Sequence, residues 1–108
     1  QLMRLMNANV CPTEFAVGTC NLEIPKSTIY ESWNHDVDTL INHNILKTVV
    51  VKDNQWYQFD DRSFHRGTAA KGWGWRYFIR VSWDTKRKPT NEVRRQVQVY
   101  LDNVNQGW

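Results

Sequence analysis

The stretch Gln58–Trp83, "QFDDRSFHRGTAAKGWGWRYFIRVSW", combines residue types that usually separate between the surface and the core of a protein. It contains one histidine, four arginines and three tryptophans. Its last part, "WRYFIRVSW", alternates with period two, which is the side-chain period of a β-strand. One face would carry Trp75, Tyr77, Ile79, Val81 and Trp83, and the other Arg76, Phe78, Arg80 and Ser82. This is the clearest strand in the chain.

The two faces of this strand allow two interpretations. If the arginine face lies in solvent, the large apolar side chains on the other face must be buried, and the arginines only keep the protein soluble. If the arginine face lines the inside of a barrel, its guanidinium groups need a carboxylate to offset their burial, which makes an anion site. His65 precedes the turn "TAAKGWG" and is predicted on the neighbouring strand of the same hairpin, where it could share one cavity with Arg76.

Outward from this stretch, the chain predicts further short strands and one helix. "TEFAVGTCNLEI", between Pro12 and Pro25, predicts a strand, a turn at Gly18 and a second strand. "ILKTVVVKD" and "NQWYQFDD" predict another hairpin, with the Asp-Asn turn between them. Residues 27–44 have apolar positions at helical spacing and predict a short helical insertion. The chain therefore predicts a mainly antiparallel β sandwich or barrel.

The C-terminal segment is ambiguous. "NEVRRQVQVYLDNV", residues 91–104, fits both the helical and the strand period, and its composition favours a strand. The basic segment "DTKRKPT", residues 84–90, predicts a solvated loop rather than a binding site.

Composition limits the class of protein. With 108 residues, 41% hydrophobic and 23% charged, we expect a single domain over residues 1–108. No membrane span or signal peptide is evident, so we expect a cytoplasmic protein with Cys11 and Cys20 reduced. The net charge of +3 suits a small anion as well as a nucleic acid.

Residues 59–83, "FDDRSFHRGTAAKGWGWRYFIRVSW", resemble the C-terminal signature of the iron(II)- and 2-oxoglutarate-dependent oxygenases. In that family a distal iron-binding histidine ends one strand, and an arginine after the following turn binds the far carboxylate of 2-oxoglutarate. The resemblance implies that His65 binds iron and that Arg76 binds the cosubstrate, with further contacts from Arg80 and Ser82. It also implies a double-stranded β-helix, a jelly-roll or cupin-like fold, complete or in part. The implied activity is hydroxylation of an unidentified substrate, with Fe(II) and 2-oxoglutarate as cofactors.

One part of the family pattern is missing. The family takes its other two iron ligands from an upstream His-x-Asp or His-x-Glu motif, and neither His35 nor His43 has an acidic residue two positions on. The chain could be a C-terminal fragment of a longer oxygenase domain, or a member that lost its metal and is inactive. Alternatively, the resemblance is misleading and His65 is a structural histidine. An incomplete barrel exposes strand edges and an apolar interior, so we expect a homodimer.

Two other classes of function stay open. One is a non-catalytic jelly-roll module for ligand binding or assembly. The other is a β domain that binds single-stranded nucleic acid through "KGWGWRYF", although the low net charge argues against nucleic acid as a partner. Exposure of Trp73, Trp75 and Tyr77 would distinguish them.

The carboxylates before His65 have a simpler interpretation than metal binding. We expect Asp60 and Asp61 to bond to turn amides or to pair with Arg62. Asp61 is predicted to orient His65 rather than to bind metal directly.

Overall fold

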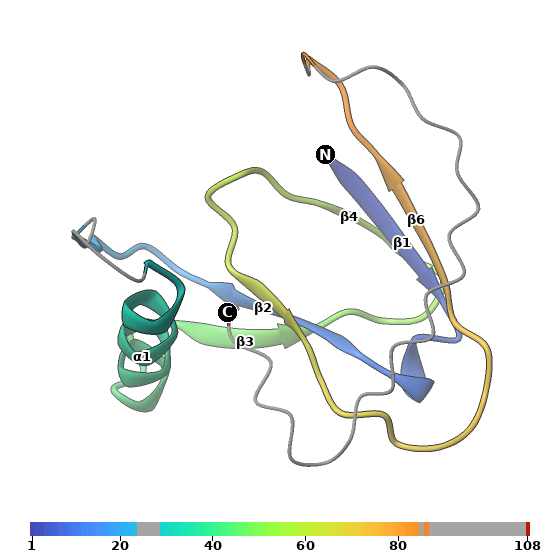
Figure 1. The fold of residues 1–108 in the computed structure, drawn as a ribbon, viewed down its shortest axis with the longest axis horizontal. Coiled ribbons are helices and arrows are strands. Elements are labelled where there is room, and N and C mark those ends of the chain that lie inside the picture. Colours follow the sequence, from blue (N-terminus) through green and yellow to red (C-terminus); the bar gives the residue numbers. More distant parts are fainter. Residues whose placement is uncertain (24–28, 85, 87–107) are drawn as a thin grey trace.

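The computed structural model describes residues 1–23, 29–84, 86 and 108. Its elements, in chain order, are β1 (Leu2–Met6), the 3-10 turn η1 (Ala8–Val10), β2 (Thr13–Val17), α1 (Ile29–Asn42), β3 (Lys47–Val50), β4 (Trp56–Gln58), β5 (His65–Gly67) and β6 (Tyr77–Val81) (Figure 1). The strands form two antiparallel sheets with the orders β4-β1-β6 and β3-β2-β5. The prediction of a mainly β chain with one short helix is therefore confirmed.

The main core lies between the two sheets. Met3 and Leu5 on β1 and Phe15 on β2 are buried in one cluster, which also contains Ala8, Val51 and Phe59. Because strand residues alternate between faces, Met3, Leu5 and Phe15 define the inner face of each sheet. The sheets thus pack through these inner faces, and burial of their apolar side chains is the main favourable contribution to folding.

Helix α1 covers the outer face of the sheet β3-β2-β5. Val37 on α1 is fully buried and packs with Leu46 and Trp108, and Ala16 and Phe64 border this second cluster. Ala16 follows Phe15 in β2 and so projects from the opposite, outer face. Figure 1 shows α1 beside β2 and β3, on the far side from β1 and β6. The helix predicted from apolar spacing over residues 27–44 is confirmed, and it makes a third layer.

Both predicted N-terminal hairpins are wrong in their pairing, although most of the strands exist. β2 forms as predicted, but residues 18–23 are not a strand, and β2 pairs instead with β3 and β5. β3 and β4 belong to different sheets. The reason is that a short alternating run determines which side chains share a face and leaves the neighbouring strand unspecified.

Gly18 ends β2 in a conformation that favours glycine. Its φ is +144°, and a Cβ at this position would lie 2.9 Å from Leu46 Cδ2. The chain bends at Gly18, which lies against Ile45 and Leu46 because Val17 pairs with Lys47, so a side chain at this position would clash with them.

Three further sequence predictions can be compared with the structure. Cys11 and Cys20 are free thiols, as predicted, and the Cys11 thiol lies 3.0 Å from the Thr68 carbonyl oxygen. Among the described residues, no helix has the length and apolar character needed to cross a membrane. The segment 91–104 and most of the basic segment 84–90 lie outside the described residues.

Candidate functional site

His65 begins β5 and faces the space between the sheets. It is paired with Phe15 on β2, and directly paired residues of antiparallel strands project from the same face. Its ring lies 5.4 Å from the ring of Phe15 and 5.5 Å from that of Phe59, between centroids. The imidazole still reaches solvent. His65 is therefore a partly packed, accessible group at the edge of the main core.

One hydrogen bond selects the tautomer of His65. Its Nδ1 lies 3.0 Å from the carbonyl oxygen of Ser63. A carbonyl oxygen can only accept, so Nδ1 carries the proton and, in the neutral ring, Nε2 keeps its lone pair. Metal-binding histidines are commonly oriented by such a bond from the nitrogen that does not bind the metal. Nε2 is thus the atom through which His65 can bind.

The Ser63 carbonyl is presented by a turn that Asp60 stabilises. The Asp60 carboxylate accepts hydrogen bonds from the Ser63 hydroxyl and from the Arg62 backbone N–H, both at 2.9 Å. These two bonds, together with the positive charge of Arg62, hold the pKa of Asp60 below its usual value. The expectation that Asp60 bonds to turn amides is confirmed. The orienting role expected for Asp61 belongs to the carbonyl of Ser63, a backbone contact that side-chain chemistry could not reveal.

The division of β6 into two faces follows its pairing with β1. Phe78 pairs with Leu5 and Arg80 with Met3, so the side chains of Phe78 and Arg80 project from the inner face. Ile79 therefore projects from the outer face, where it is exposed to solvent. Phe78 and Arg80 are exposed as well, so neither face of β6 is buried. The interpretation that buries the face of Tyr77 and Ile79 is therefore wrong, although Arg80 does reach solvent as it expects.

Arg76 lies just before β6 and contacts the other sheet. Its guanidinium Nη1 donates a hydrogen bond of 2.5 Å to the carbonyl oxygen of Cys11, which precedes β2. His65 pairs with Phe15, and the four residue steps from Cys11 to Phe15 would span about 13 Å of extended chain. Arg76 therefore lies before the start of β2, whereas His65 lies beside its middle residue, Phe15.

The predicted hairpin between the strands of His65 and Arg76 is wrong, because β5 and β6 belong to different sheets. His65 and Arg80 nevertheless project from inner faces, one from each sheet. Ser82 follows the last residue of β6 and is exposed.

The described residues do not form a complete metal centre. Within residues 1–23, 29–84, 86 and 108, no three histidine, cysteine, aspartate or glutamate side chains lie close enough to hold a metal ion. The rings that pack on His65 are aromatic. Of the three ligands that the oxygenase resemblance requires, these residues supply His65, so they do not fit iron by themselves.

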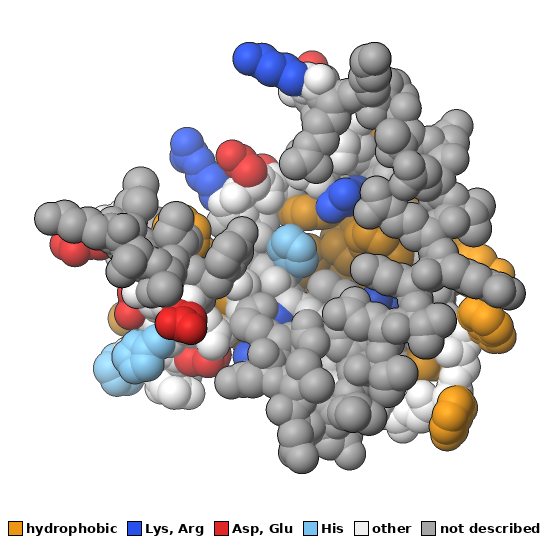
Figure 2. All heavy atoms as spheres, in the orientation of Figure 1, with side chains coloured by type: hydrophobic (Ala, Val, Ile, Leu, Met, Phe, Trp, Pro, Cys, Tyr) orange, Lys and Arg blue, Asp and Glu red, His pale blue; other side chains and the backbone are white. Residues whose placement is uncertain are grey.

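Several large aromatic side chains lie on the surface. Trp73 is fully exposed, Trp75 is 79% exposed and Tyr77 is 64% exposed. On β4, Trp56 is half exposed, and the guanidinium of Arg4 lies 5.5 Å from its ring centroid. We call Trp56, Trp73, Trp75 and Tyr77 the aromatic surface. Trp73 and Trp75 therefore lie in solvent and are not part of the core. In Figure 2, hydrophobic side chains show mainly in the middle of the view and on the side away from α1, and many of the acidic side chains lie near α1.

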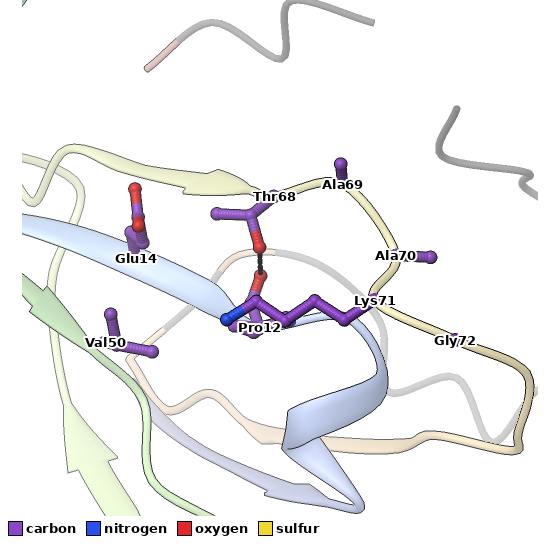
Figure 3. A pocket seen from close by; sticks show the side chains of 8 residues that line it. All are labelled: Pro12, Glu14, Val50, Thr68, Ala69, Ala70, Lys71 and Gly72. Carbon is purple, nitrogen blue, oxygen red and sulfur yellow. Dashed lines mark hydrogen bonds between the residues drawn. The ribbon is translucent and has the colours of Figure 1, made fainter. Parts of the chain in front are cut away.

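An open groove of about 690 Å³ lies beside the start of β2 (Figure 3). Small side chains of the segment 68–72 line one wall, with Pro12 and Glu14 from the β2 side. The Thr68 hydroxyl donates to the Pro12 carbonyl, at 2.8 Å, and Lys71 reaches back over Pro12. Glu14 alternates with Phe15 and projects from the outer face, so this groove lies apart from His65.

The chain matches no family model, no curated protein and no solved structure. Its strand order and its side chains are therefore the basis for inferring its function.

Proposed function

We propose that the chain forms the C-terminal part of a jelly-roll domain of the iron(II)- and 2-oxoglutarate-dependent oxygenase type. The observation that carries this proposal is the strand order. An eight-stranded jelly roll is one long antiparallel hairpin that is wound up, in which the first strand pairs with the eighth, the second with the seventh, and so on. These pairs lie alternately in the two sheets. Its third strand lies between the sixth and the eighth, and its fourth lies between the fifth and the seventh.

The two observed sheets agree with this order when β1 to β6 are taken as the third to the eighth strand. β1 then lies between the sixth and eighth strands, β4 and β6, and β2 lies between the fifth and seventh, β3 and β5. His65 belongs to the seventh strand, and Arg76 directly precedes the eighth. The resemblance came from residues 59–83 alone, so the pairing of β1, β2 and β3 is independent support for it.

The proposal requires two more strands, which would pair with the outer edges of β6 and β5. In the oxygenase family this part of the domain supplies the first histidine and the carboxylate. These strands come from outside the described residues. For the chain as it stands we propose a homodimer in which a second copy covers the two edges, since unpaired strand edges and apolar interior surface favour association.

In the completed domain, the described residues would bind the metal and the cosubstrate and would not themselves take part in the reaction. His65 would hold the metal through Nε2, and iron would supply the oxygen chemistry. Arg76 would exchange the Cys11 carbonyl for a carboxylate of 2-oxoglutarate, because an arginine bonds more strongly to a charged, bidentate acceptor. Arg80, on the inner face of β6, and Ser82 would make further contacts.

The test is calorimetric titration of 2-oxoglutarate into the protein under anaerobic conditions, with and without iron(II). We expect binding that requires iron and that is lost in both His65→Ala and Arg76→Ala. Arg4→Ala, which removes an arginine from the outer face of β1, is the matched control and should bind as the unchanged protein does. Absence of binding with and without iron would reject the proposal and leave a metal-free module.

A second candidate is favoured by the aromatic surface, which could bind single-stranded nucleic acid. Trp73, Trp75 and Tyr77 are all exposed, which is the condition that distinguishes this class. The outer face of this sheet carries Arg4, and the strands β1, β4 and β6 contain no acidic residue. Aromatic side chains that stack on bases each contribute about 1–3 kcal/mol.

Fluorescence titration with oligothymidylate tests this second candidate. We expect tryptophan quenching that weakens steeply with salt and that is reduced in Trp75→Ala. His65→Ala should bind as before, because His65 faces the other side of the structure. Quenching that is unchanged in Trp75→Ala would reject the aromatic surface as the site.

A further inference from the structure

A cleft of about 320 Å³ opens beside His65, at the edge of the main core. Its walls come from β2 and β3 on one side and from β4 and the segment that follows β4 on the other. The residues that matter for its chemistry are Phe15, Val17, Val49, Tyr57, Phe59 and Arg62. This volume lies within the lower range of sites that bind small molecules.

Two of the side chains that line the cleft also pack against His65. The imidazole ring packs against Phe15 and Phe59, and both of these rings also line the cleft. In the sheet, Phe15 lies between His65 on β5 and Val49 on β3. A molecule held in the cleft would therefore lie against the same two aromatic rings as the histidine.

The lining of the cleft combines apolar side chains with the polar residues Gln58, Arg62 and Ser63, and it is accessible to solvent. Val17 is 51% exposed and Val49 is 40% exposed, although both occupy inner-face positions together with the buried Phe15. Tyr57 adds a third ring beside those of Phe15 and Phe59. Covering these side chains with an apolar ligand would remove them from water, which is the usual driving force for binding in such sites.

The charged side chain among the described lining residues is Arg62. Its positive charge is partly balanced by Asp60, whose carboxylate bonds to the turn and does not line the cleft. A guanidinium at the wall of an apolar cleft favours a ligand with a carboxylate, because it can donate two parallel hydrogen bonds to that group.

We infer that this cleft binds a small carboxylic acid with an apolar body. The apolar body lies against Phe15, Val49 and Phe59, and the carboxylate pairs with Arg62. If the proposed oxygenase function is right, this molecule is the substrate, held beside the metal-binding histidine. The binding itself depends on the cleft alone and requires neither iron nor 2-oxoglutarate.

The test uses three probes of nearly equal shape in the absence of metal: phenylacetate, phenethyl alcohol and phenethylamine. Binding is followed by two-dimensional NMR of the labelled protein. We expect resonances of the cleft residues to shift. Phenylacetate should bind about fivefold more tightly than phenethylamine, which is the gain in affinity that one exposed ion pair contributes. Arg62→Gln should abolish this difference while the alcohol binds as before.

Two bulky substitutions test the location. Val49→Trp and Val17→Trp, both at exposed positions, should weaken the binding of all three probes. Two variants are used so that a folding defect in one does not decide the test. Arg76→Ala should leave phenylacetate binding unchanged. The inference would be overturned if the resonances of the cleft residues did not shift, or if both tryptophan variants bound the probes as tightly as the unchanged protein does. Loss of phenylacetate binding in Arg76→Ala would also overturn it.

The outcomes separate this inference from the proposed function. Phenylacetate binding in the cleft without any iron-dependent binding of 2-oxoglutarate would uphold the cleft and reject the oxygenase. Iron-dependent 2-oxoglutarate binding without phenylacetate binding would uphold the oxygenase and reject the cleft.

Discussion

Among the described residues, two arginine–tryptophan pairs lie in very different surroundings. Arg66 on β5 stacks on Trp108 with its guanidinium carbon 4.1 Å from the ring centroid, and it pairs with Glu14 at 3.1 Å and with Asp38 at 3.6 Å. Arg4 on β1 lies 5.5 Å from the ring of Trp56, which is half exposed, and the Nε–H of Arg4 donates to Asn54 Oδ1 at 2.8 Å.

The Arg66–Trp108 pair is enclosed by a network of contacts. Trp108 is buried against Val37 and Leu46, and its Nε1–H donates to Asp38 at 2.7 Å. The pair therefore joins α1 to the outer face of the sheet β3-β2-β5. On the outer face of β4-β1-β6, the Arg4–Trp56 pair joins neighbouring strands and leaves apolar area accessible. The same two residue types thus stabilise one sheet and leave the outer face of the other exposed to solvent.

The largest difference should appear when the tryptophans are removed. Trp108→Ala would leave a cavity beneath α1 and remove the indole hydrogen bond, so we expect a loss of about 3–4 kcal/mol in the free energy of unfolding. Trp56→Ala should cost less than about 1 kcal/mol, since the ring is half exposed. Urea unfolding followed by circular dichroism measures both, and equal losses would contradict the comparison.

Removal of the arginines should have a smaller effect in the same direction. Arg66→Met keeps much of the apolar stem and leaves Glu14 and Asp38 without their cation, with an expected loss of about 1–2 kcal/mol. Arg4→Met should change stability by no more than about 0.5 kcal/mol. Adding Glu14→Gln to each variant is a check: it should alter the effect of Arg66→Met and not that of Arg4→Met.

The smallest expected effect concerns the turn that orients His65. The folded pKa of Asp60 is lowered from 3.8, so its contribution to stability is present above pH 3.8 and is lost as the pH falls through the lower folded value. Asp60→Asn should remove this dependence. Nitrogen NMR of the His65 ring provides a second measurement, because loss of the turn should increase the Nε2–H tautomer. An unchanged tautomer ratio would show that Ser63 holds the ring without Asp60.

Much of the candidate site was predictable because its residues are close in the chain. The period-two alternation of residues 75–83 correctly separated Phe78 and Arg80 from Tyr77 and Ile79. It did not reveal which face is inner, since Phe78 and Ile79 are both large and apolar. That choice depends on β1, whose Met3 and Leu5 pair with Arg80 and Phe78.

The contacts of His65 were not predictable in this way. Phe15 is fifty positions earlier in the chain, and the Ser63 contact is made by a carbonyl that every residue possesses. Asp61 was the more attractive partner on chemical grounds, but the turn directs the carbonyl of Ser63 to the ring instead.

The local pattern of residues was enough to predict the strands around residues 13–17, 47–50, 56–58 and 77–81 and the helix at 29–42, because side-chain period and turn propensity are properties of neighbouring residues. The assignment of those strands to two sheets, and with it the cleft beside His65 and the exposed aromatic surface, required the tertiary structure. A strand can pair with any edge of matching length and polarity, so its actual neighbours are selected by the burial of Met3, Leu5 and Phe15 in one common core.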